Sequence, residues 1–221
     1  MRQFILPDLG EGLEEAEIAA DETYARFLGD RTTEATGLMA LECGLAALHR
    51  GHLAAARRWL REASALLREA DPTASLPLAL SLTAQARGQA GDADGATEAA
   101  TEAERSLRPG GSLYDVDVLL GRAWAAAAAG ALTEAQQKAH MAADLANERG
   151  TTLAVKAAHE LLRLGDPREA ATRLARCARQ VQGSLGAACG EHAAAIDSGD
   201  ARRIEHAAAQ FADMGALLRE L

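Results

Sequence analysis

Residues 32–70 read TTEATGLMALECGLAALHRGHLAAARRWLREASALLREA, a segment rich in Ala, Leu, Arg and Glu. These residues are strong helix formers, and the apolar ones recur at helical rather than alternating spacing. Gly51 interrupts the pattern near its middle. Since Gly adopts the left-handed conformation that ends many helices, we expect one helix to end there and a second to begin. The segment therefore predicts a helical hairpin.

The same interruption recurs along the chain. Glycines follow helical sequence at intervals of 40, 39, 35 and 34 residues, at Gly51, Gly91, Gly130, Gly165 and Gly199. An Asp follows three of these glycines, at positions 92, 166 and 200, where it can cap the next helix. Pro167 falls in the first turn of its helix, where a missing N–H costs little. Five breaks predict about five helical pairs.

Each predicted pair repeats one pattern of small and apolar residues. Five, nine and twelve residues after the breaks stand Ala56, Ala96, Ala135, Ala170 and Ile204; Leu60, Ala100, Ala139, Leu174 and Ala208; and Ala63, Ala103, Ala142, Cys177 and Phe211. These offsets share one helical face. Seven residues before the breaks stand Gly44, Ala84, Ala123, Ala158 and His192. Small residues there let facing helices approach closely, and each pair leaves an apolar side for the next pair to cover.

The composition agrees with closely packed helices. Of the 221 residues, 48% are hydrophobic but only 3% are aromatic, so Ala and Leu supply most of the apolar content. A chain of this length can bury a core, in one or two domains, without metal or disulfides. The three cysteines are odd in number and lack CxxC spacing, which argues against a disulfide framework or a zinc site. We therefore expect a cytoplasmic protein.

Two resemblances cover the helical part. The small residue, break Gly and Ala in this phase resemble the tetratricopeptide repeat, with its large aromatic positions mostly replaced by Ala or Leu. This resemblance implies an all-α superhelix, a stack of antiparallel helical hairpins; the alternative is an unspecialised Ala-rich bundle. More specifically, residues 55–72, 76–96, 113–136 and 157–178 resemble the helical-repeat region of large actinobacterial LuxR-type transcriptional regulators, and this resemblance extends over residues 20–221.

The LuxR-type resemblance implies a sensing or scaffolding role. In that family a P-loop ATPase module precedes the repeats and a helix-turn-helix domain follows them. The chain contains no G-x-x-x-x-G-K-[ST] motif, and HAAAQFADMGALLREL (206–221) resembles the last repeat. We therefore expect neither flanking module, no enzymatic activity and no cofactor, with function exerted through protein or ligand contacts.

The N-terminal sequence FILPDLGEGLEEAEI (residues 4–18) resembles the first strand of the lipoyl domain of a dihydrolipoyl acyltransferase. That domain needs a lysine on a hairpin turn some tens of residues later, but the only two lysines are Lys138 and Lys156. We therefore interpret residues 1–19 as an acidic leader and residues 20–221 as the helical-repeat domain. The alternatives are a lipoyl-domain or acyltransferase-like protein of 2-oxo acid dehydrogenase complexes and a truncated fusion remnant.

The net charge of −9 comes mainly from the N-terminus. Residues 1–30 carry two arginines and eight acids, which leaves 21 basic and 24 acidic residues elsewhere. Without a basic stripe, direct nucleic-acid binding is not expected. Nor does any segment approach the roughly 20 apolar residues of a membrane span, so we expect no membrane contact.

Candidate catalytic and metal sites have simpler explanations. His49 and His52 flank Gly51 without a third metal ligand nearby. The neighbours His159 and Glu160, like Glu191 and His192, point to different sides of a helix and are poor acid/base pairs. Cys177 falls at a packing position, which favours a buried thiol over a nucleophile.

Binding residues are predicted on the concave face. In a stack of this type the residues six and two before each break point to the inner side, and these are Gln85, Trp124 and His159 in one row and His49, Gln89, Arg163 and Asp197 in the other. A Trp beside polar groups suits peptide or helix binding, although Trp124 is equally consistent with a core position. A terminal repeat that lacks a polar cap also predicts possible self-association through residues 217–221.

Overall fold

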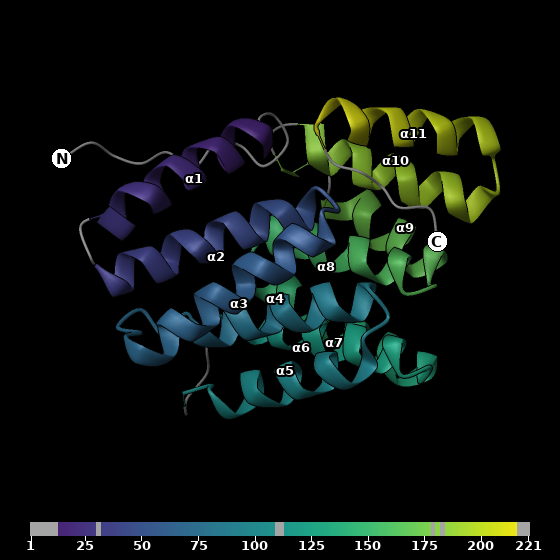
Figure 1. Cartoon of the computed structure of the whole chain (residues 1–221). Coiled ribbons are helices and arrows are strands. Elements are labelled where there is room, and N and C mark those ends of the chain that lie inside the picture. The colour runs from purple at the N-terminus through teal and green to yellow at the C-terminus, as the bar shows by residue number, and fades with distance from the viewer. Residues whose placement is uncertain (1–12, 30–31, 109–112, 178–179, 182–183, 216–221) are drawn as a thin grey trace.

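The computed structural model describes residues 13–29, 32–108, 113–177, 180–181 and 184–215, which contain eleven α-helices and no strand. The helices are α1 (Leu13–Gly29), α2 (Thr33–His49), α3 (Leu53–Glu69), α4 (Leu76–Gln89), α5 (Ala93–Arg105), α6 (Asp115–Ala128), α7 (Leu132–Arg149), α8 (Thr151–Arg163), α9 (Pro167–Cys177), α10 (Ser184–Ser198) and α11 (Ala201–Asp213). Each packs against the next along the chain, from purple α1 to yellow α11 in Figure 1. The prediction of an all-α fold is confirmed.

The five glycine breaks separate the two helices of five pairs, α2–α3, α4–α5, α6–α7, α8–α9 and α10–α11. All five glycines have positive φ, between 65° and 88°. After α2, the N–H of Gly51 donates to the Leu48 carbonyl (3.0 Å) and the N–H of His52 to the Ala47 carbonyl (2.8 Å). This is the Schellman pattern, and equivalent bonds form at the other four breaks. The predicted positions of the five hairpins are confirmed.

The predicted helix starts are also confirmed. Each of the three Asp carboxylates accepts backbone N–H groups of the following helix: Asp92 from Gly95 (3.0 Å), Asp166 from Glu169 (3.2 Å) and Asp200 from Arg202 and Arg203 (3.0 and 3.3 Å). Pro167 is the first residue of α9. These contacts satisfy N–H groups that have no partner within their own helix.

The predicted core face is buried in the first four pairs and shifted in the fifth. In those four pairs all twelve residues at the repeated offsets are buried. In α11, however, Ile204 is half-buried and Ala208 is exposed, while Ala207 and Phe211 are buried. The prediction for Ala208 is wrong because no described helix packs on the far side of α11, so its buried face is narrower.

Small residues bring the first helices of successive pairs close together. A Cβ atom at Gly88 would lie 2.6 Å from the carbonyl oxygen of Trp124, and one at Gly121 would lie 3.1 Å from that of Ser81. The backbones of α4 and α6 are therefore in near-direct contact. This approach sets Gln89, at the end of α4, beside Trp124 on α6.

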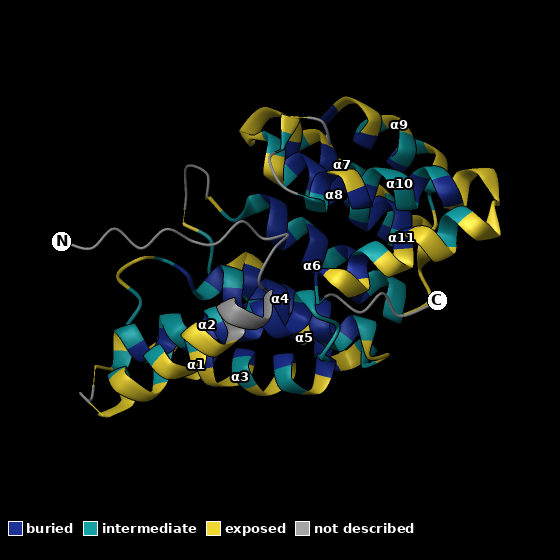
Figure 2. Ribbon diagram, turned by 90° about the horizontal axis from the view of Figure 1, so that it is seen from above, coloured by how far each residue is buried: buried dark blue, intermediate teal, exposed yellow. Residues whose placement is uncertain are grey.

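Two main apolar clusters form the core. One joins α2, α3 and α4, and the other extends from α6 to α11. Figure 2 shows the buried residues in dark blue along the inner helices and the exposed residues in yellow on the outer ones. Ala and Leu together supply most of the buried residues of both clusters, as the composition predicts.

The N-terminal helix starts earlier than the proposed domain boundary. α1 begins at Leu13, so residues 13–19 of the predicted leader are helical, as are the last residues of the segment that resembles a lipoyl strand. Residues 4–12 of that segment lie outside the described residues. Tyr24 packs edge-on against Trp59, with ring centroids 4.8 Å apart, and this contact joins α1 to α3. Within the described residues, helix therefore includes residues 13–19 of the expected leader, where Glu and Ala favour a helix over a strand.

Candidate functional site

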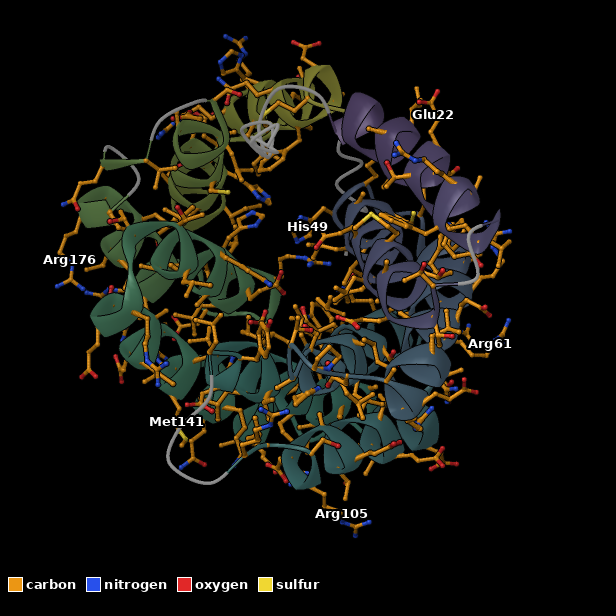
Figure 3. The ribbon with its side chains drawn as sticks, turned by 90° about the vertical axis from the view of Figure 1, so that its left-hand side faces the viewer. Glu22, His49, Arg61, Arg105, Met141 and Arg176 are labelled. Carbon is orange, nitrogen blue, oxygen red and sulfur yellow. The ribbon has the colours of Figure 1, made fainter. Side chains whose placement is uncertain are left out.

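The candidate site lies on the inner side of the stack, where the ends of the first helices meet. His49, Gln89 and Arg163 are the last residues of α2, α4 and α8. They occupy the same repeat position, so stacking the pairs brings them to one side. In Figure 3 His49 points toward the middle of the molecule, whereas Arg61, Arg105 and Arg176 point outward. We call the side chains gathered there the inner wall: His49, Gln89, Asp117, Trp124, Lys156, His159, Glu160, Arg163 and His192.

Arg163 is the centre of a hydrogen-bonded network on the inner wall. Its guanidinium donates to Glu160 (2.9 Å) and to the side-chain oxygen of Gln89 (2.7 Å), which lies 74 residues away in sequence. The same guanidinium lies over the ring of Trp124, 4.8 Å from the centroid. The indole N–H of Trp124 donates to the second oxygen of Glu160 (2.7 Å). The network joins α4, α6 and α8.

At the same repeat position α6 has a small residue, Ala128, where α4 has Gln89 and α8 has Arg163.

The inner wall holds charges that are largely removed from water. Glu160 is only 8% exposed. Burial would raise the pKa of its carboxyl, but the charge of Arg163 and the hydrogen bonds from Trp124 and Arg163 lower the pKa below its usual range. A second pair, Lys156 with Asp117 at 2.6 Å, joins α8 to α6. Opposite charges are thus matched within the wall.

Three histidines from different pairs lie beside these charges, and we call them the histidine cluster: His49 on α2, His159 on α8 and His192 on α10. The Nε2 atom of His159 lies 3.0 Å from Nδ1 of His192. Phe211 of α11 stacks on His159 with centroids 5.5 Å apart. Burial lowers the pKa of His159 to about 3 and that of His49 to about 4. Both imidazoles are therefore neutral at pH 7.

The structure joins three of the seven predicted site residues by direct contacts and places His49 and His159 near the same charges. Gln89, Trp124 and Arg163 share one network, and the charges of Glu160 and Arg163 act on both His49 and His159. Gln85 is only 2% exposed, and its Nε2 atom has no hydrogen-bond partner among the described residues. Asp197 is exposed near the end of α10 and does not join the network.

Trp124 fits both interpretations of its role. It is 5% exposed and belongs to the core cluster of α6 to α11, so its ring is not an open surface. At the same time it supports the guanidinium of Arg163, which is more accessible. A partner approaching the inner wall would meet Arg163, Gln89 and His49 first.

Sequence reasoning missed four members of the inner wall: Asp117, Lys156, Glu160 and His192. Glu160 was considered only with its neighbour His159, and the structure confirms that these two side chains turn to different partners. Likewise His192 contacts His159, whereas Glu191 pairs with Arg203. The spacing of three between Glu160 and Arg163 was the available signal, since such residues lie on one helix face.

The chemistry of the remaining candidate groups is limited. Cys177 is buried as predicted, and burial raises the pKa of Cys189 to about 12, so its thiol is protonated at neutral pH. Lys138 and Lys156 lie within α7 and α8 rather than on a hairpin.

Across the described ranges, no group of three or more His, Cys, Asp or Glu side chains is arranged to hold a metal ion. No described helix is both long and apolar enough to cross a bilayer.

Comparisons with protein-family models, with curated proteins and with solved structures find no match to this chain. The fold and the inner wall are therefore the basis for a functional hypothesis.

Proposed function

We propose that this chain is a non-enzymatic, cytoplasmic helical-repeat protein that binds a protein, peptide or other ligand on its inner wall. The tetratricopeptide-like phase of its five pairs and the resemblance to the repeat region of LuxR-type regulators support a sensing or scaffolding role. The observation that carries the proposal is the network in which Gln89, Trp124 and Arg163 meet from three different pairs. Arginine over an aromatic ring is a frequent anchor in protein interfaces.

The proposed partner site differs from the outer surface in its preorganisation. Arg163 is held by two hydrogen bonds and by the Trp124 ring before any partner arrives, so little side-chain entropy is lost on binding. By contrast, Arg61 on the outer side of α3 points into solvent (Figure 3). A fixed guanidinium suits a partner that presents a carboxylate or a backbone carbonyl.

The test uses peptides selected for binding to the wild-type protein from a displayed random library. The variant Trp59→Phe leaves Trp124 as the sole tryptophan, so its fluorescence reports binding at the inner wall. We expect Arg163→Ala to weaken the selected peptides at least about tenfold, the loss of one charge-assisted hydrogen bond. Arg68→Ala, on the outer side, is the matched control and should leave affinity unchanged. Peptides that bind both variants equally and leave Trp124 fluorescence constant would contradict the proposal.

The lipoyl alternative has its own test. If residues 4–18 belonged to a functional lipoyl protein, co-expression with a lipoate ligase would add one lipoyl group to a lysine. We expect the intact mass to be unchanged, because both lysines lie within helices and Lys156 is engaged by Asp117.

A further inference from the structure

A small cavity lies on the outer side of the first two pairs. α3 and α5 both pack on α4 but not directly on each other, so a groove runs between them with α4 as its floor. Within the groove is a cavity of about 170 Å³, which we call the outer cavity. It has room for about five or six water molecules and is smaller than the pockets that hold drug-sized ligands. The outer cavity therefore suits a ligand of few heavy atoms.

Ion pairs close both ends of the groove around the outer cavity. At the start of α5, Asp92 lies between Arg57 at 3.7 Å and Arg87 at 3.6 Å. Further along the groove, Arg68 holds Glu102 through two hydrogen bonds of 2.8 Å. Between these two ends α5 lines the cavity with a glycine and an alanine, and α3 lines it with a serine. Their short side chains leave the space between the ion pairs open.

The position of Arg87 depends on the glycine that faces it. A Cβ atom at Gly95 would overlap Nη1 of Arg87, so a larger residue there would displace the guanidinium. The ion pair of Arg87 with Asp92, at 3.6 Å, is too long for a hydrogen bond. No described residue accepts a hydrogen bond from this guanidinium, so its N–H groups are available to a ligand in the cavity.

The deeper part of the outer cavity presents two hydroxyl groups. Ser64 of α3 is 4% exposed and Thr83 of α4 is 8% exposed, and both line the cavity. Each hydroxyl donates to a carbonyl oxygen of its own helix, that of Leu60 at 2.7 Å and that of Ala79 at 2.8 Å. Since both protons are used within the protein, the hydroxyl oxygens are left as acceptors. This part of the cavity suits a ligand group that donates.

Two opposite charges on the rim have no ion-pair partner among the described residues. Arg61 of α3 and Glu98 of α5 line the cavity from its two sides, and both are exposed. The guanidinium of Arg61 points into solvent (Figure 3), from where its long stem can turn toward a bound anion. The cavity thus offers guanidinium donors for an anion, together with a free carboxylate for a cation.

We propose that the outer cavity binds a free α-amino acid with a short side chain. Its carboxylate is bound by the guanidinium groups of Arg87 and Arg61, since a guanidinium matches a carboxylate through parallel N–H bonds. Its ammonium group is bound by Glu98 and by the hydroxyl oxygens of Ser64 and Thr83. A simple anion would leave Glu98 unpaired, and a simple cation would not use Arg87. The site is separate from the inner wall, so it does not rest on the proposed function.

The test is a titration of the ¹⁵N-labelled full chain with L-alanine, followed by the amide signals of Gly95 and Ala99. We expect these signals to shift and to saturate. Propionate, which lacks the ammonium group, and ethylamine, which lacks the carboxylate, should each bind at least about tenfold more weakly, the loss of one charge-assisted contact. Absence of a saturable shift with L-alanine, or equal binding of propionate, would overturn the proposal.

Variants locate the two halves of the ligand. Arg87→Gln should weaken L-alanine binding at least about tenfold, because it removes the carboxylate contact. Glu98→Gln should weaken L-alanine but leave the weaker binding of propionate unchanged. Arg105→Gln, which alters an outward-pointing side chain at the end of α5, is the matched control and should bind like the wild type. Circular dichroism checks that each variant is folded. Equal L-alanine affinity in folded Arg87→Gln and wild-type chains would contradict the proposal.

Discussion

The inner wall and the outer helices use the same ion-pair chemistry in different surroundings. On the outer side Arg68 of α3 holds Glu102 of α5 by two hydrogen bonds of 2.8 Å, with both side chains more than a third exposed. On the inner wall Arg163 holds Glu160 at 2.9 Å, with the side chains 28% and 11% exposed. The geometries are alike, but water competes more strongly with the outer pair. Burial, rather than bond length, therefore determines how much each ion pair contributes to the stability of the fold.

The difference shows what each pair does for the fold. The outer pair adds a contact between α3 and α5, which are already joined through the core around α4. The inner pair fixes the side chain that reaches Gln89, two pairs away. Losing the outer pair removes an accessory contact, whereas losing Glu160 leaves the Arg163 guanidinium without its anion and the buried indole N–H of Trp124 without its acceptor.

Removing the buried carboxylate tests this contrast most strongly. Glu160→Ala leaves Arg163 and the indole N–H of Trp124 without their acceptor, so we expect a loss of about 3 kcal/mol in the free energy of unfolding. Urea denaturation followed by circular dichroism measures it. A loss below about 1 kcal/mol would show that water already screens the inner pair as it does the outer one.

Filling the close approach of α4 and α6 tests the framework behind the inner wall. Gly88→Ala places a Cβ atom against the Trp124 backbone, and the resulting shift should cost about 1–3 kcal/mol. Gly29→Ala is the matched control, because nothing lies within 4 Å of its added Cβ. Thermal unfolding of both variants should separate them clearly; equal stability would mean that the helices adjust without strain.

The loss of stability at acid pH should distinguish the inner wall from the outer helices. Because the pKa of His159 is lowered to about 3, its contribution to stability is complete above about pH 6.5 and is lost as the pH falls toward 3. We expect His159→Gln to lessen the acid loss by up to about 1.4 kcal/mol per pH unit below 6.5. Denaturant titrations at pH 7.5 and 5.5 measure this effect. Parallel pH curves for variant and wild type would show that His159 is protonated with equal ease in both states.

The outer pair should have the smallest effect. In a double-mutant cycle, Arg68→Ala and Glu102→Ala should reveal a coupling energy below about 1 kcal/mol, since both groups remain accessible to water. Added salt should weaken this coupling further. A coupling that equals the effect of Glu160→Ala would abolish the proposed distinction between the two sides.

The hairpins could be predicted from the sequence because the end of a helix depends mainly on the residues next to it. At the five breaks a glycine after helical sequence forms the Schellman turn, and at three of them an Asp in the next position caps the helix that follows. Ala208 was misplaced because its burial depends on what lies beyond α11, which a repeated spacing does not reveal. The helix at residues 13–19 was not expected, because the strand resemblance of this segment drew attention away from its helix-forming Glu and Ala residues.

The candidate site was predicted only in part, since it depends on the curvature of the stack. The repeat position predicts that Gln89 and Arg163 lie on the same side of the stack. It does not predict the 2.7 Å hydrogen bond between their side chains. Nothing local indicates that Glu160 turns toward Trp124 on α6. Such contacts depend on the angle between successive pairs, which is the sum of many small packing differences in an Ala-rich core.

The bond between Gln89 and Arg163 also bears on how the molecule melts. An array in which each unit touches only its neighbours frays from its ends, and its calorimetric transition is broad. Here a hydrogen bond joins the second and fourth units across the third, so we expect the central units to unfold together. The ratio of van't Hoff to calorimetric enthalpy should therefore lie closer to one than in a simple linear array.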